Sequence, residues 1–187
     1  AKIGVGKSTG TKLISACGNI KKQGVYEIDM TISVEEFIYS DEYCGGIANG
    51  KRLKACIAGG SSVPILPANL LLTTAKGEKR MMNYESLSDG GFATGTMMGS
   101  GGFIVLDETQ CVVKHTFTLA RFYRHESCGQ CSPCREGTGW MEKILKKIDS
   151  GKGSSSDIDL LWDIQRKIEG NTICPLGDAA AWPVAAA

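Results

Sequence analysis

The sequence predicts an α+β protein in which a β-rich, β-grasp-like first part is followed by a small helical bundle. Short runs rich in β-branched residues end at Gly or Pro throughout residues 11–98. A Gly-rich segment, residues 95–107, then forms a hinge that contains the short buried strand FIVL. From Asp107 onward the apolar residues recur at helical spacing. We therefore expect a linker over residues 1–10, a β-grasp-like domain over 11–98 and a helical domain over 99–187.

The expected elements of the first part are, in chain order, a strand, a second strand, a helix and a further strand. The short helix is expected over residues 33–41, because Ser33 is followed three residues later by Glu36, as in a capping box. The expected strands are residues 11–18, 24–29, 52–60 and 63–67. This order predicts a β-grasp-like sheet.

The segment GVGKST, Gly4 to Thr9, resembles half of a phosphate-binding P-loop. The full motif has Gly where this chain has Ala1, and it must open a helix. Gly10 and the β-branched run after it argue against a helix. We expect a flexible linker here.

Three apolar stripes predict three helices, and the C-terminal AAAWPVAAA opens a fourth. Asp107, with Gln110 three residues later, is the expected cap of the first helix, and Ser156 with Asp159 that of the third. Their apolar faces are Val113, Phe117, Ala120 and Tyr123; Trp140, Met141, Ile144, Leu145 and Ile148; and Ile158, Leu161, Ile164 and Ile168.

Composition excludes several classes of protein. The net charge is +1 and the basic residues are dispersed, so no nucleic-acid partner is expected. No apolar run approaches the roughly 18 residues of a membrane span, and the start has no signal-peptide pattern. Neither end carries the signals of a complete chain, so we expect a fragment of a longer protein.

Eight of the 187 residues are cysteines, too few for a disulfide-rich secreted domain. We expect a reducing, cytoplasmic-side compartment. Four cysteines are scattered singly, as buried free thiols would be. They are Cys17, Cys44, Cys56 and Cys111.

Cys128, Cys131 and Cys134 are spaced C-x2-C-x2-C, which places three thiols within seven residues. One loop with this spacing can reach three corners of a cuboidal iron–sulfur cluster, whereas structural zinc more often uses C-x2-C pairs. Cys174 is the candidate fourth ligand, because Pro175 follows it as in bacterial ferredoxin motifs. The spacing favours a 4Fe-4S cluster; zinc, a disulfide or free thiols remain the alternatives.

His115 and His125 are alternative fourth ligands. Of two nearby cations, Arg135 adjoins a candidate ligand and is the better candidate for a supporting role, while Lys143 suits a solvated helix face. A cluster with four protein ligands has no open position for substrate. The sequence also lacks a nucleophile–base pair, so we expect single-electron transfer and no catalytic residue.

Two segments, residues 126–141 and 170–184, closely resemble the C-terminal part of the NADH-binding flavoprotein subunit of respiratory complex I, the NADH-quinone oxidoreductase. Residues 10–29 and 99–113 also fit this family. The resemblance implies a β-grasp domain of the SLBB type, then a four-helix domain in which Cys128, Cys131, Cys134 and Cys174 ligate a 4Fe-4S cluster.

The resemblance also implies that this cluster accepts electrons from FMN, reduced by NADH, and passes them toward quinone. The family's flavin and nicotinamide domain is absent, so FMN and NADH are expected only on the parent protein. The implied partners are the iron–sulfur subunits of the peripheral arm, without direct membrane insertion. The implied location is the cytoplasmic side of the bacterial inner membrane, or the matrix side in a mitochondrion.

Two other functions are consistent with the sequence. Flavoprotein subunits of NAD-linked hydrogenases and formate dehydrogenases share this module. Alternatively, the same cysteines bind a structural zinc ion that stabilises a non-redox interaction domain. Nothing in residues 11–98 names a ligand for the SLBB-like part.

Overall fold

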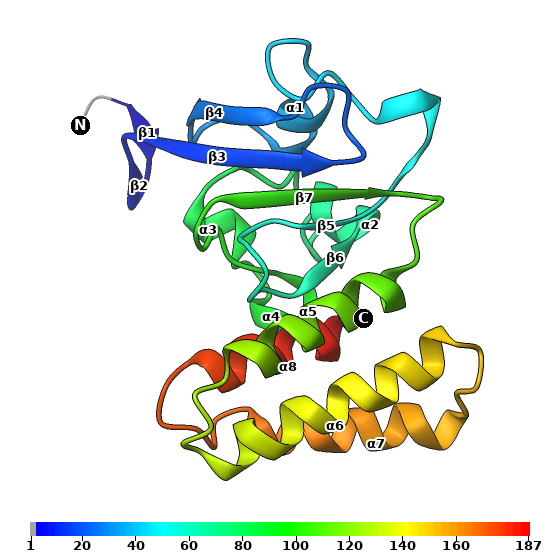
Figure 1. The fold of residues 1–187 in the computed structure, drawn as a ribbon. Coiled ribbons are helices and arrows are strands. Elements are labelled where there is room, and N and C mark those ends of the chain that lie inside the picture. Colours follow the sequence, from blue (N-terminus) through cyan, green and yellow to red (C-terminus); the bar gives the residue numbers. More distant parts are fainter. Residues whose placement is uncertain (1–2) are drawn as a thin grey trace. The chain divides into compact units, whose positions relative to one another are not determined.

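The computed structural model describes residues 3–187 and divides into two compact units, which meet in the sequence between Gln110 and Cys111 (Figure 1). The first is a mixed α+β unit and the second is helical. The expected domain boundary at residues 98/99 is therefore too early. Strand β7 (Gly102–Asp107) pairs with two strands of the first unit and completes its sheet.

The sheet of the first unit has five strands in the order β4-β3-β7-β5-β6. Strands β3 and β7 pair in parallel, from Ser15 opposite Gly102 to Gly18 opposite Val105, and the other neighbours are antiparallel. The other strands are β3 (Thr11–Gly18), β4 (Gly24–Asp29), β5 (Leu53–Ile57) and β6 (Ile65–Pro67). A central parallel pair flanked by antiparallel strands is the β-grasp-like arrangement that the element order predicts.

Helices α1 (Val34–Tyr39) and α2 (Ala68–Leu72) contribute buried apolar side chains to the core on one face of this sheet. Ser33 caps α1 as predicted, since its hydroxyl accepts the Glu36 N–H at 3.0 Å. Phe37 lies edge-on to Phe103 of β7, with ring centroids 5.2 Å apart. The other short helical turns are η1 (Ala48–Gly50), α3 (Tyr84–Leu87) and α4 (Gly91–Thr94).

Arg80 is fully buried in the first unit and holds together the segment that joins β6 to β7. Its guanidinium donates to the carbonyl oxygens of Leu70 at 2.9 Å, Leu87 at 3.0 Å and Thr94 at 2.9 Å, and also to that of Ser86. Buried polar groups require such partners. This one side chain therefore fixes a stretch with little regular structure of its own.

The expected linker is ordered where the structure describes it. Residues Gly4–Val5 (β1) and Ser8–Thr9 (β2) form a small antiparallel hairpin, followed directly by β3. Glu85 anchors it by accepting hydrogen bonds from the Lys7 N–H, at 2.8 Å, and from the buried Ser8 hydroxyl. No helix follows GVGKST, so the P-loop is rejected as expected. The first two residues of the expected linker lie outside the described residues.

The second unit contains four helices that pack on one another (Figure 1). They are α5 (Val112–Glu126), α6 (Ser132–Asp149), α7 (Ser155–Ile168) and α8 (Leu176–Ala186). Most of the predicted apolar faces meet in one core. Trp140 and Ile158 are exceptions, since they are 51% and 61% exposed. Across residues 3–187, no helix has both the length and the apolar character needed to cross a membrane.

Both predicted caps in this unit are wrong. Asp107 ends β7, where its carboxylate accepts the Thr109 N–H at 2.9 Å, and α5 begins later, after Cys111. Helix α7 is capped two residues earlier than expected, by a capping box of Ser154 and Asp157. The Ser-x-x-Asp pattern occurs twice in SSSDID, and only Asp157 also reaches Lys147 of α6, so packing between helices selects it.

The Asp157 carboxylate makes the stability of the helical unit dependent on pH. Hydrogen bonds from Lys147, at 2.8 Å to each oxygen, and then from Ser154 lower the pKa of Asp157 from 3.8 to about 2. Its contribution is therefore complete above pH 3.8 and is lost as the pH falls through about 2. We expect Asp157→Asn to lower the denaturation midpoint at neutral pH and to flatten its decline below pH 4, in urea titrations followed by Trp fluorescence.

Asp163→Asn is the matched control, because Asp163 makes an exposed ion pair with Lys167 four residues later on the same helix. Such pairs contribute little to stability. Equal losses of stability in the two variants would contradict a special role for the Asp157 network.

Candidate metal centre

The four predicted ligands Cys128, Cys131, Cys134 and Cys174 line one cavity of about 150 Å³ in the helical unit. Cys128 lies in the loop after α5, and Cys174 in the loop before α8. Cys131 is the N-cap of α6. Cys134 lies inside the first turn of that helix and is buried, so the triplet is carried by a loop together with the start of a helix and not by one loop alone.

The turn that carries the first three cysteines is held by side chains on either side of it. Gly129 has a φ of +79°, a conformation that L residues with a side chain rarely adopt. Its N–H donates to the Ser127 hydroxyl at 3.3 Å, and its carbonyl accepts from Arg135 at 2.7 Å. Arg135 also donates to the Ser132 hydroxyl at 3.2 Å. Arg135 thus spans the turn between Cys128 and the start of α6, which is the supporting position expected for it.

The electrostatics of this turn favour negative charge. Cys131 and Cys134 lie at the N-terminus of α6, where unpaired N–H groups and the helix dipole create a partial positive charge. Thiolates and anionic clusters are stabilised at such positions. The location of these two side chains therefore suits metal ligation.

The loop that brings Cys174 to the cavity is fixed from both sides. Asp178 of α8 accepts the Gly170 N–H at 2.7 Å, and the Thr172 hydroxyl donates to the Cys174 carbonyl at 2.9 Å. The Ile173 N–H lies 3.4 Å from the Cys131 sulfur, where it can donate a hydrogen bond. This contact joins residues 42 positions apart in the sequence and brings the second loop against the first.

Neither histidine lines this cavity. The side chain of His125 is 85% exposed, and its Nδ1 lies 2.9 Å from a carboxylate oxygen of Glu126. His115 is partly buried on α5, and burial, followed by the nearby Lys114, lowers its pKa. Cys174, not a histidine, is the fourth candidate ligand that the fold brings to the triplet.

The four remaining cysteines also lie outside the cavity. Cys44 and Cys56 are buried in the first unit, where burial raises the pKa of Cys44 to about 12 and that of Cys56 well above its usual value. Both are thiols at neutral pH and therefore poor ligands. Cys17 and Cys111 are exposed, so their expected burial is wrong.

The donor set is one that a 4Fe-4S cluster can use. Four cysteines line one cavity, and thiolates are the usual protein ligands of such clusters. Each thiolate of a 4Fe-4S cluster binds a different iron, so its ligands need to surround a volume and not a point. These residues can therefore accommodate such a cluster.

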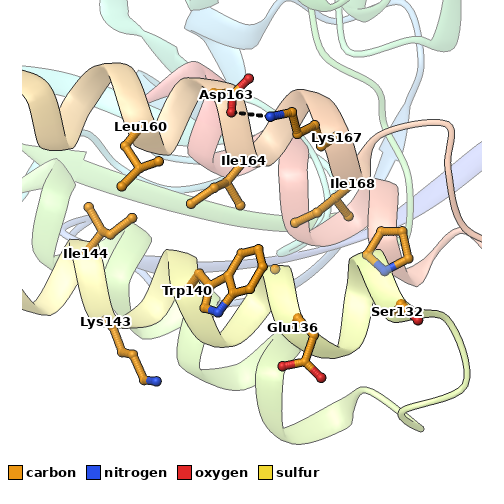
Figure 2. A pocket seen from close by; sticks show the side chains of 12 residues that line it. Ser132, Glu136, Trp140, Lys143, Ile144, Leu160, Asp163, Ile164, Lys167 and Ile168 are labelled. Carbon is orange, nitrogen blue, oxygen red and sulfur yellow. Dashed lines mark hydrogen bonds and ion pairs between the residues drawn. The ribbon is translucent and has the colours of Figure 1, made fainter.

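Lys143 lies at a different surface of the same unit, in a groove of about 680 Å³ between α6 and α7. Figure 2 shows Ile144, Leu160, Ile164 and Ile168 facing this groove, while Lys143 points outward from α6. Lys143 does not line the cysteine cavity. The sequence did not predict this groove, because the apolar stripe that includes Trp140 predicted that this face of α6 is buried.

Comparison with known proteins identifies the family. Residues 114–187 match the model of the NADH-ubiquinone oxidoreductase-F iron-sulfur binding region. Nearly the whole chain, 98%, aligns at 43% identity with the F subunit of NADH-quinone oxidoreductase from Rickettsia bellii.

The chain belongs to the family of NADH-quinone oxidoreductase F subunits.

An F subunit of NADH-quinone oxidoreductase from Rhizobium meliloti is 42% identical over 94% of the chain. The chain spans about two fifths of these relatives, 42% of the Rickettsia protein and 38% of the Rhizobium protein. Among solved structures, an NAD+-reducing [NiFe]-hydrogenase in the H2-reduced state matches 98% of this chain and 28% of its own, with a TM-score of 0.79 and 26% identity. The matched family region contains all four cysteines that line the cavity.

Proposed function

We propose that this chain is the electron-carrying C-terminal part of a flavoprotein of this family, with Cys128, Cys131, Cys134 and Cys174 ligating a 4Fe-4S cluster. The single observation that carries the proposal is the convergence of these four cysteines on one cavity within the matched family region. When bound, such a cluster supplies reversible one-electron transfer.

The chain's own residues hold and shield the site. The four thiolates occupy four ligand positions and leave no open one for substrate. Arg135 fixes the turn of the triplet through Gly129 and Ser132, and the N-terminus of α6 stabilises its negative charge. No residue of this chain is assigned a catalytic step.

In the complete enzyme, we infer that electrons reach this site from FMN after NADH oxidation and leave toward quinone. FMN and NADH are assigned to the part of the relatives that this chain does not span. The first unit, with its β-grasp-like sheet, is assigned as an SLBB domain. The proposed neighbours are iron–sulfur subunits of the peripheral arm, on the cytoplasmic or matrix side of the membrane.

Part of a hydrogenase is the second candidate, because an NAD+-reducing [NiFe]-hydrogenase shares the fold at a TM-score of 0.79. The higher identity, 43%, to the NADH-quinone oxidoreductase relatives favours the first. Both candidates use the cysteine site as an electron carrier.

The test is to measure iron, acid-labile sulfide and zinc per chain on protein purified without oxygen, with EPR spectra before and after dithionite. We expect about four irons and four sulfides, and a signal that appears on reduction. One zinc, no sulfide and no EPR signal would show that the cysteines form a structural zinc site, and this result would overturn the proposal.

A further inference from the structure

One side-chain hydroxyl lies against a candidate ligand sulfur. The Oγ of Ser127 is 3.2 Å from the Sγ of Cys134. Ser127 is the C-cap of α5, and its own N–H donates to the Tyr123 carbonyl at 3.0 Å, which fixes its backbone. The contact therefore joins the end of one helix to the first turn of the next.

The direction of this hydrogen bond follows from the partners of each atom. The Gly129 N–H donates to the Ser127 hydroxyl oxygen at 3.3 Å and so occupies one of its lone pairs. The hydroxyl proton remains, and among the described residues the Cys134 sulfur is its one recorded acceptor. A metal-bound thiolate carries no proton, so the hydroxyl must be the donor.

Hydrogen bonds to ligand sulfurs are one of the means by which proteins set cluster potentials. Such a bond stabilises negative charge on sulfur, and the reduced cluster carries one more negative charge than the oxidised one. The bond therefore favours the reduced state. The other recorded donor to a ligand sulfur is the Ile173 backbone N–H, so Ser127 supplies the side-chain contribution.

We propose that Ser127 is a positioning residue for electron transfer, whose hydroxyl donates to the Cys134 thiolate and raises the reduction potential of the site. This inference rests on the proposed function of the four cysteines. It assigns the setting of the potential to a residue that is not itself a ligand.

The experiment is an EPR-monitored redox titration of the anaerobically purified 187-residue chain and its Ser127→Ala variant. We expect unchanged iron and sulfide content in the variant. We expect its equilibrium constant for one-electron reduction to be roughly tenfold smaller, because hydrogen bonds to charged groups contribute more than those between neutral groups. Tenfold corresponds to a midpoint potential about 59 mV lower for one electron. Ser127→Thr keeps the hydroxyl and should retain the wild-type potential.

Ser150→Ala is the matched control, because Ser150 is also a helix C-cap whose hydroxyl makes one hydrogen bond, at 2.8 Å to the Lys147 carbonyl. It lies at the opposite end of α6 from Cys134. Its removal should leave the potential unchanged.

Three outcomes would overturn the inference while the proposed function stands. These are an unchanged potential in Ser127→Ala, an equal drop in Ser127→Thr, or loss of the cluster from Ser127→Ala, which would show that the hydroxyl holds the ligand and does not tune it. A wild-type chain that takes up no iron or sulfide would overturn the proposed function, and this inference with it.

Discussion

Replacing Cys174 with Ala is expected to reduce the four-iron cluster content of the chain to near zero while the helical unit remains folded. The first three cysteines occupy one turn and the start of α6, and Cys174 is the proposed fourth ligand, which lines the same cavity from the loop before α8. Without it, one iron of a cuboidal cluster lacks a protein thiolate. Iron and sulfide analysis of anaerobically purified protein measures the loss, and far-UV circular dichroism checks the helices.

Cys111→Ala is the control for this experiment. Cys111 is an exposed cysteine at the start of α5 and does not line the cavity, so this variant should keep the full complement of iron and sulfide. Retention of about four irons by Cys174→Ala would remove Cys174 from the ligand set and reopen the assignment of the fourth position.

Replacing Arg80 with Met is expected to destabilise the first unit by about 4 kcal/mol, because four backbone carbonyl groups lose a hydrogen bond from a buried guanidinium at once. Those carbonyls belong to Leu70, Ser86, Leu87 and Thr94, and Arg80 itself is fully buried. Met fills similar space but donates no hydrogen bond. We expect residues 68–96 to exchange their amide hydrogens much faster in the variant.

The measurement must report on the first unit alone. All three Trp residues, Trp140, Trp162 and Trp182, belong to the helical unit, so Trp fluorescence follows the other part of the chain. Hydrogen exchange read by mass spectrometry resolves the two units. Arg52→Met is the control, since Arg52 makes an exposed ion pair with Glu108, and its loss should cost less than about 1 kcal/mol. Similar exchange in the two variants would contradict the role of Arg80.

The elements that the sequence predicted correctly are those that local interactions define. Strands β3 and β4 have the predicted bounds, because alternating apolar residues and the turn between them depend on neighbours in the chain. Helix α1 follows from Ser33, whose capping partner is three residues away. The spacing of Cys128, Cys131 and Cys134 indicated metal chemistry for the same reason, since the three residues lie within seven positions of one another.

The candidate site was predictable in its residues but not in its geometry. In the sequence, only the proline that follows Cys174 indicates that it is a ligand. The folded chain brings Cys174 to the triplet through the packing of α6, α7 and α8. The contact between Ser127 and Cys134 had no signal in the sequence, since serine is common at helix ends. Its effect depends on which atom the hydroxyl faces.

The sequence by itself determined the α+β class, most helices and strands, and which four of the eight cysteines form the candidate site. The tertiary structure decided which partners distant segments have. Strand β7 pairs in parallel with β3, more than 80 residues earlier, and this moved the boundary between the units from 98/99 to 110/111. The buried Arg80 guanidinium donates to backbone carbonyls at four positions in the chain. Asp157 is the acidic residue that caps α7, because it also pairs with Lys147 of α6. Local hydrogen bonds and periodicity are encoded within a few residues, whereas these contacts depend on the packing of the whole unit.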